Sequence, residues 1–285
     1  MGAAILDGAA IAAAIRAELA EEVASLEQVG VTPGLGTILV GDNPASASYV
    51  RLKHQDCEEI GIRSFGEHLR EDTTQDRLLK LIAEYNANPD IDAFLVQLPL
   101  PKQLDELQSL LAVDPEKDVD GLHPVNLGRL VMGNLGPIAC TPAGIVELLV
   151  RHGVEIEGKH VVIIGRGLTI GRPLANLLAL KREHANAAVT VVHTGVQDLG
   201  ALTRQADILV AAAGAPGLVK PDMVKPGAAV VGAGVTMDGK KVISDVEESV
   251  AEVAGWITPR IGGVGPMTRA MLLKNTVLAA SKRRS

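Results

Sequence analysis

Residues 161–173 constrain the possible folds of this chain more than any other segment. They read VVIIGRGLTIGRP, a short apolar run followed by a glycine-rich turn and the start of a helix. Their glycines are spaced GxGxxxG, one residue longer than the usual dinucleotide fingerprint. Because glycine lets a backbone approach a pyrophosphate and a helix N-terminus offers free N–H donors, the segment predicts a nucleotide-binding turn. On its own, the pattern also fits an ordinary tight turn between a strand and a helix.

The elements around this turn alternate between strand and helix along the whole chain. After it, a helix begins near Gly171, and strands are expected at 159–164, 189–193, 208–212 and 228–231. Before it, strands are expected at 35–40, 62–69 and 93–98, with helices at 9–28, at 44–60 and up to about Asn86. Asn43 is the predicted N-cap of the helix at 44–60, with Pro44 in its first position and Gly61 as its stop. Alternation of this kind is typical of parallel sheets, and in the second half it predicts a doubly wound nucleotide-binding domain.

Length and composition favour two α/β domains. The 285 residues exceed the usual size of one domain, and 47% of them are hydrophobic while only 2% are aromatic, so Ala, Val, Leu and Ile must fill the core. We expect one domain over 1–140, with a C-terminal helix at 266–285 packing back on it, a Rossmann-like domain over 141–265, and a cleft between them. Residues 112–140 are predicted to form a long functional loop, after which Thr141-Pro142 caps a helix.

Charge and cysteine content exclude several classes of protein. The net charge is −7 without a basic patch, which argues against nucleic-acid binding. Asp7, Arg16 and Glu18 interrupt the apolar start, so no signal peptide is expected, and no apolar stretch is long enough to span a membrane. Cys57 and Cys140 have no metal-ligand spacing, so we expect no metal site and a reducing, cytoplasmic environment.

The second strand of the nucleotide-binding domain bears on cofactor choice. It ends His193-Thr194-Gly195, without the carboxylate that usually takes the ribose 2′-hydroxyl of NAD. Arg166 lies inside the glycine turn, and a guanidinium suits phosphate geometry. This combination favours NADP, although Arg166 could equally be a solvated loop residue.

Three further groups of residues could carry chemistry. Tyr49 and Lys53 share one face of a predicted helix, but a helix lysine is usually a solvated charge. Gln97 ends an apolar strand, where open α/β sheets assemble their sites. Asp118 and Asp120 could bind a metal, form a turn or accept hydrogen bonds from a ligand. The glycines at 262–265 could let a ligand contact the backbone or form a flexible loop.

Taken together, these motifs resemble the methylenetetrahydrofolate dehydrogenase/cyclohydrolase family. The matching segments are GDNPAS at 41–46 with Tyr49 and Lys53, VQLPLP at 96–101, KDVDG at 117–121, Cys140-Thr141-Pro142, the glycine turn, and GGVGPMT at 262–268. The resemblance implies an enzyme that oxidises 5,10-methylenetetrahydrofolate with NADP+ and hydrolyses the methenyl product to 10-formyltetrahydrofolate. It further implies a homodimer paired through the nucleotide-binding domains, with the first domain binding folate.

The same resemblance assigns expected roles to individual residues. Lys53 is the general acid/base, Gln97 its hydrogen-bond partner, Tyr49 packs the aminobenzoyl ring and Asp120 binds the pterin edge. Further folate contacts are expected at Leu98, Pro99, Gly263, Val264 and Pro266. Cofactor contacts are expected at Thr141, Gly165, Arg166, Gly167, Ile170, Gly171, His193 and Thr194.

Four positions depart from the family pattern. Gly167 and Gly195 replace a serine and a basic residue near the expected 2′-phosphate, Gly232 replaces an aspartate, and Ile261 replaces a proline. Two rival interpretations remain: another two-domain dehydrogenase of the shikimate or amino-acid type, and a catalytically silent nucleotide-binding protein. Formation of methenyltetrahydrofolate distinguishes the three.

Overall fold

A computed structural model describes residues 2–134, 136–238 and 241–282 of the chain. The chain forms two compact units, of which unit 1 comprises Met1–Ala12 and Ala139–Thr268, and unit 2 comprises Ala13–Ile138 and Arg269–Ser285. The divisions fall within α1 (Gly8–Glu27), just before α6 (Cys140–Arg151), and within α9 (Val264–Ser281). Of the helix predicted at 266–285, residues 283–285 lie outside the described residues.

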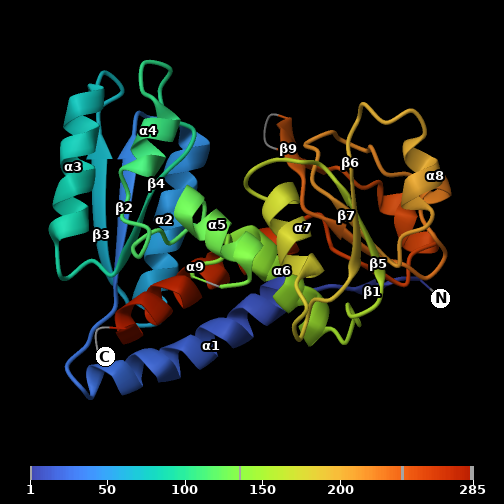
Figure 1. The fold of residues 1–285 in the computed structure, drawn as a ribbon, viewed down its shortest axis with the longest axis horizontal. Helices are drawn as coiled ribbons and strands as arrows, with labels where there is room; N and C mark the ends of the chain where they lie inside the picture. Colours follow the sequence, from blue (N-terminus) through green and yellow to red (C-terminus); the bar gives the residue numbers. More distant parts are fainter. Residues whose placement is uncertain (1, 135, 239–240, 283–285) are drawn as a thin grey trace. The chain divides into compact units, whose positions relative to one another are not determined.

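Unit 1 is built on a six-stranded sheet in the order β1-β11-β8-β7-β5-β6, and every neighbouring pair is parallel. Figure 1 labels β1, β5, β6 and β7 of this sheet. Its strands are β1 (Ala4–Ile5), β5 (His160–Ile164), β6 (Ala188–Val192), β7 (Ile208–Ala211), β8 (Ala229–Gly232) and β11 (Trp256–Ile257). The chain runs from β5 to β6 on one side and then to β7 on the other side, so the strand order reverses at β5. Open α/β sheets bind ligands at the carboxyl ends of their strands at such a switch point. The predicted doubly wound α/β fold is therefore confirmed.

Short elements complete unit 1. They are α7 (Gly171–Ala179), α8 (Leu199–Thr203), the 3-10 turns η1 (Pro221–Met223) and η2 (Glu248–Glu252), and an antiparallel pair of strands, β9 (Val235–Asp238) and β10 (Lys241–Ser244). The central strands β5 and β7 are almost wholly buried, as expected for parallel strands covered on both faces. Neither β9 nor β10 was predicted, because segments this short carry little periodicity.

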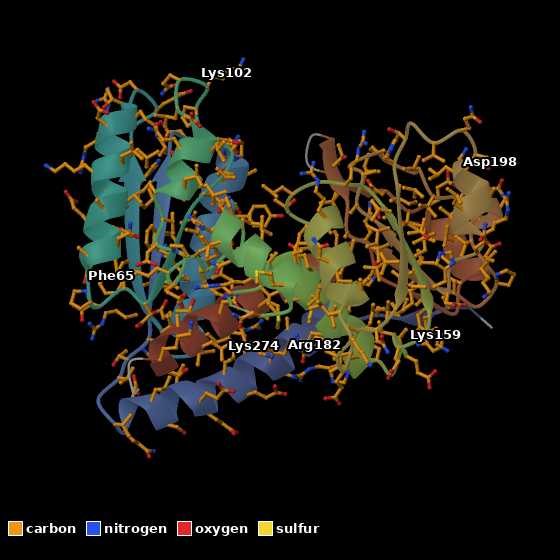
Figure 2. All side chains as sticks on the ribbon, in the orientation of Figure 1. Phe65, Lys102, Lys159, Arg182, Asp198 and Lys274 are labelled. Carbon is orange, nitrogen blue, oxygen red and sulfur yellow. The ribbon has the colours of Figure 1, made fainter. Side chains whose placement is uncertain are left out.

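Unit 2 contains a three-stranded parallel sheet in the order β3-β2-β4, formed by β2 (Gly34–Val40), β3 (Arg63–Leu69) and β4 (Ala93–Val96). On one face, Tyr85 of α3 (Gln75–Ala87) lies so close to Gly36 that a Cβ there would meet the ring at 2.9 Å. On the other face, His54 of α2 (Pro44–Glu59) bonds to Thr37 at 2.7 Å. Figure 2 marks the two ends of this sheet, with Phe65 near the start of β3 and Lys102 beyond the end of β4.

The prediction of a continuous loop at 112–140 is wrong. It contains the helix α5 (Pro124–Met132), which follows the short helix α4 (Glu106–Leu111). Pro124 occupies the first turn of α5, and Gly133 ends the helix with a φ of 73°. Glycine and proline at these two places are helix boundary signals, and the prediction mistook them for loop composition.

The predicted cap at Thr141-Pro142 is also wrong. Helix α6 begins at Cys140, and its N-cap is Ala139, which forms no side-chain capping bond. Thr141 lies instead in the first turn, and its Oγ1 is 3.0 Å from Oγ1 of Thr268. Among the helices of the described ranges, none is both long and apolar enough to cross a membrane.

Candidate functional site

Helix α2 presents Tyr49 and Lys53 from a firmly capped start. Asn43 Oδ1 accepts hydrogen bonds from the backbone N–H groups of Ala45 and Ser46 at 3.0 and 3.1 Å, which confirms the predicted N-cap. One turn separates Tyr49 from Lys53, but their environments differ. Tyr49 is 50% exposed, whereas Lys53 is only 9% exposed. A ring open to solvent therefore lies one turn before an almost buried amine.

The amine of Lys53 is bound to Gln97, which directly follows β4. Lys53 Nζ donates to Gln97 Oε1 at 3.1 Å, and Gln97 Nε2 donates to the carbonyl of Leu98 at 2.8 Å. Both ends of the amide are thus engaged, and the second bond directs the amide oxygen toward Lys53. The carboxyl end of a parallel strand is where α/β sheets place reacting groups. Leu98 and Pro99, which come next, are exposed.

Burial disfavours the charged forms of His54 and Cys57, two titratable neighbours of Lys53. The pKa of His54 is lowered, first by burial and then by the charge of Lys53. The pKa of Cys57 is raised to about 12, first by burial and then by the charge of Asp56. Since His54 is neutral at ordinary pH and Cys57 stays a thiol, neither supplies a counter-ion to the lysine. The neutral amide of Gln97 is the hydrogen-bond partner that the structure gives Lys53.

The two aspartates of the KDVDG motif have different environments. Asp118 is 3% exposed and accepts hydrogen bonds from the N–H groups of Gly121 and His123 and from the amide of Asn126. Burial raises the pKa of Asp118, against the effect of these bonds. Asp120 is half-buried, and within the described ranges its carboxylate accepts no hydrogen bond. Asp118 therefore organises the loop and leaves Asp120 available to a ligand.

Asp120 opens onto a largely apolar pocket in unit 2, which we call the Asp120 pocket. Its wall includes the end of β4, helix α4 and the loop before α5. The lining residues are Phe94, Leu95, Val96, Leu98, Glu106, Ser109, Leu110, Val113, Asp118, Asp120 and Leu122. With a volume of about 30 Å³, the pocket is far smaller than the roughly 300 Å³ of a complete small-molecule pocket, so it marks the apolar surface beside Asp120 and not a whole ligand site.

In unit 1 the glycine turn leaves a run of backbone donors unused. A Cβ on Gly165 would lie 2.2 Å from the carbonyl oxygen of Ala212, and one on Gly171 would lie 2.2 Å from that of Gly165. A Cβ on Gly167, by contrast, would meet nothing within 4 Å. In the part of the chain that the structure describes, none of the backbone N–H groups of residues 166–170 donates a hydrogen bond. Together with the uncapped N-terminus of α7, they fit a pyrophosphate.

The residues predicted to select the cofactor lie in this turn and directly after β6. These two segments are neighbours because β5 and β6 are adjacent strands. Arg166 is exposed and forms no hydrogen bond to any described residue. After β6, the N–H of Gly195 donates to Nδ1 of His193 at 3.1 Å, and Thr194 is exposed. A Cβ on Gly195 would lie 3.0 Å from the imidazole, so a side chain there would require the ring to move.

A second pocket, which we call the glycine pocket, gathers five of the predicted residues in unit 1. Thr141, Ile170, Gly263, Val264 and Pro266 all line it, together with Thr268 of the same GGVGPMT segment. Gly232 and Ile261, two of the departures from the family pattern, also line it. A Cβ on Gly232 would lie 2.8 Å from Ser244 Oγ, so an aspartate at this position would require Ser244 to move.

Comparisons with known proteins agree with this arrangement. Residues 6–120 match the model of the tetrahydrofolate dehydrogenase/cyclohydrolase catalytic domain, and residues 139–284 match that of the NAD(P)-binding domain of the same family. The bifunctional protein FolD of Syntrophotalea carbinolica is 56% identical over 283 residues, covering 99% of this chain and 98% of that protein. The chain belongs to the tetrahydrofolate dehydrogenase/cyclohydrolase family.

Solved structures of the family superpose on nearly the whole chain. A FolD methylenetetrahydrofolate dehydrogenase/cyclohydrolase from Campylobacter jejuni has a TM-score of 0.94 and 45% identity, covering 98% of this chain and 99% of its own. The methylenetetrahydrofolate dehydrogenase-cyclohydrolase from Trypanosoma brucei, complexed with NADP cofactor and an inhibitor, has a TM-score of 0.92 and 42% identity, with 100% and 99% coverage.

Two supporting carboxylates in this family member were missed by sequence reasoning. Glu106 Oε1 accepts from the N–H of Leu100 at 2.9 Å, next to the turn that carries Gln97. Asp245 is fully buried, and its Oδ2 accepts from the N–H groups of Ala213 and Gly214 at 2.7 and 2.9 Å. Neither carboxylate belongs to a recognisable motif. The partners of Asp245 are distant in sequence, and the partner of Glu106 follows the end of β4, which the sequence placed only approximately.

Proposed function

We propose that this chain oxidises 5,10-methylenetetrahydrofolate to the methenyl cation with NADP+ and hydrolyses that cation to 10-formyltetrahydrofolate, with Lys53 as the general acid/base of the hydrolysis. The observation that carries the proposal is the 3.1 Å bond from the almost buried Lys53 amine to Gln97. A solvated helix lysine would have no such burial and no such partner. Family membership supports both activities.

The oxidation depends mainly on holding the reactants in place. The methylene carbon lies between two nitrogens whose lone pairs stabilise the cation as hydride leaves, so no strong base is needed. Bound NADP+ supplies the hydride acceptor. The free N–H groups of residues 166–170 would hold its pyrophosphate, Arg166 and the residues after β6 would hold its 2′-phosphate, and the glycine pocket would take its nicotinamide end.

The hydrolysis requires proton transfers. Water adds to the methenyl carbon and loses one proton, and the hydroxyl so formed gives up its own proton as the formyl C=O forms. The ring nitrogen N5 takes up one proton as its bond to that carbon breaks, so one proton is released overall. An amine held beside the reacting carbon can accept a proton from the added water and donate one to N5. Gln97 orients the Lys53 amine by accepting a hydrogen bond from it. The other positions on the amine nitrogen remain available for the proton transfers of the reaction.

The folate is bound in part by a carboxylate that forms no hydrogen bond to the described residues. Asp120 accepts two hydrogen bonds from adjacent N–H groups of the pterin, because its carboxylate lines the Asp120 pocket and accepts none from the described part of the chain. Tyr49 packs its exposed ring on the aminobenzoyl group, and the exposed residues Leu98 and Pro99 also contact the folate. Gly263, Val264 and Pro266, the other residues that the resemblance assigns to the folate, line the glycine pocket of unit 1. Lys53, Gln97 and Asp120 all belong to unit 2, and the glycine turn belongs to unit 1.

Replacement of Lys53 by Met tests this assignment, because Met keeps the length of the side chain and removes the amine. Methenyl hydrolysis should fall by about a hundredfold or more, the usual contribution of a positioned acid/base. Methylenetetrahydrofolate oxidation should persist in part in the same preparation. Lys102→Met, at an exposed lysine of unit 2, serves as the control and should leave both rates unchanged. Near-normal hydrolysis by Lys53→Met would refute the role of Lys53.

We also infer that the protein acts as a cytoplasmic homodimer paired through unit 1, without nucleic-acid or membrane partners. Strand β6 supports the pairing, because it lies at one edge of the six-stranded sheet and its Val191 is 41% exposed. An uncovered edge strand readily pairs with another chain. Light scattering of the purified protein measures the mass directly, and a Val191→Lys variant should shift it toward that of a monomer.

A further inference from the structure

The turn that carries Gln97 is fastened at both ends. At its start, the N–H of Gln97 donates to the carbonyl of Ile38 on β2 at 2.8 Å. At its end, the N–H of Leu100 donates to Glu106 Oε1 at 2.9 Å. The exposed residues Leu98 and Pro99 lie between these two bonds. Glu106 is therefore the side chain that closes the turn after β4.

Glu106 can serve as an anchor because its own helix is tied to the rest of unit 2. Asp105 caps α4 by accepting from the N–H of Gln108 at 2.9 Å, and its own N–H donates to Oε1 of Gln75 on α3 at 2.9 Å. Gln75 Nε2 in turn donates to Oγ of the buried Ser109 at 3.2 Å. This network holds α4 against α3, so Glu106 approaches the turn from a fixed base.

Through the turn, Glu106 acts on the orientation of the Gln97 amide. The amide is planar, so the bond from its Nε2 to the Leu98 carbonyl also sets the direction of its Oε1, which accepts from Lys53. If the 98–100 backbone rotates, the Leu98 carbonyl moves, and the amide loses the bond that orients it. The amine of Lys53 would then be free to leave its position beside the reacting carbon.

We propose that Glu106 is a positioning residue for the cyclohydrolase reaction, acting through Leu100, Leu98 and Gln97 on Lys53. The proposal rests on the role of Lys53 given above. It makes two specific demands. The hydrolysis should suffer more than the oxidation, because only the hydrolysis needs the amine. Glutamine should replace glutamate at 106, because an amide oxygen can accept the Leu100 N–H without a charge.

The experiment measures both activities on Glu106→Ala, Glu106→Gln and the control Gln108→Ala, an exposed α4 residue whose side chain forms no hydrogen bond to the described residues. In Glu106→Ala, kcat of methenyl hydrolysis should fall by about tenfold, corresponding to the loss of one hydrogen bond that involves a charged group. The oxidation rate should change by less than about twofold, as should both rates in Glu106→Gln and Gln108→Ala. Combining Glu106→Ala with Lys53→Met should lower hydrolysis no further than Lys53→Met alone, because the two act on one step.

Three results would overturn the inference: normal hydrolysis by Glu106→Ala, equal loss in Glu106→Gln and Glu106→Ala, or a parallel loss of both activities. The second would mean that the carboxylate charge acts directly on the folate in the Asp120 pocket, which Glu106 also lines. Normal hydrolysis by Lys53→Met would remove the proposed function and this inference together. Impaired hydrolysis by Lys53→Met with normal hydrolysis by Glu106→Ala would overturn the inference alone.

Discussion

Replacement of Gly171 by Ala tests whether the glycine turn is shaped by close backbone contacts. The added Cβ would lie 2.2 Å from the carbonyl oxygen of Gly165 and 2.7 Å from its carbonyl carbon. Reaching an ordinary contact distance of about 3.3 Å requires the start of α7 to move away from the turn by about 1 Å. Both contacts are backbone atoms, so no side-chain rotation can relieve the overlap. Overpacking of this kind costs about 1 to 3 kcal/mol.

For a protein of this size, such a loss lowers the melting temperature by roughly 5 °C. The displacement should also weaken NADP+ binding, because the N–H groups of residues 166–170 lie directly before α7. Thermal unfolding and calorimetric titration with NADP+ measure the two effects.

Gly167→Ala is the matched control, since its added Cβ would meet nothing within 4 Å. Its melting temperature should stay the same or rise slightly, because alanine restricts the unfolded chain. If Gly171→Ala melts like the unmodified protein and binds NADP+ equally well, or if Gly167→Ala is the less stable variant, the steric argument for the turn fails.

Three further predictions concern single side chains. Arg166→Ala should reduce the preference for NADP+ over NAD+ by about tenfold to a hundredfold, as measured by the ratio of kcat/KM values, with little change in stability because Arg166 is exposed; equal use of NAD+ by the unmodified enzyme would contradict this. Asp120→Ala should raise KM for the folate in both reactions by about tenfold or more while NADP+ binding and melting temperature persist, and an unchanged KM would make Asp120 a turn residue. Asp207→Asn tests how stability depends on pH, since the hydrogen bond from Lys225 lowers the pKa of Asp207. The stabilisation by the ionised carboxylate is complete above the ordinary aspartate pKa of about 3.9 and is lost as pH falls through the lower pKa of the folded state. The variant should therefore melt below the unmodified protein at pH 7, with the difference narrowing below about pH 4, and a constant difference would contradict this pH dependence.

Periodicity and boundary residues were sufficient to predict most of the fold. Asn43-Pro44 marked the start of α2, and Gly61, with a φ of 81°, follows its end. These signals are local, because a cap or a left-handed residue depends on its immediate neighbours. The prediction failed at residues 112–140 because it counted the Pro and Gly that bound α5 as loop composition, although the nine residues of this helix are themselves amphipathic.

The site residues could be found from motifs, but the separate role of each residue could not. Asp118 and Asp120 are two residues apart in one motif, and their chemistry in isolation is identical. Only the folded loop gives Asp118 three hydrogen bonds and leaves Asp120 with none from the described residues. Burial and partners are tertiary properties, so a sequence motif indicates which groups are present and the fold decides which of them can meet a substrate.

The same reasoning explains why Lys53 looked unremarkable by spacing alone. A lysine on a helix acquires a catalytic environment from segments remote in sequence, here Gln97 after β4 and, through the turn, Glu106 on α4. Each contact in that series is a single hydrogen bond, and each can be removed without touching the amine. If replacement of Glu106 slows the hydrolysis and leaves the oxidation unchanged, the geometry of this turn therefore affects one activity and not the other, although both use the same folate.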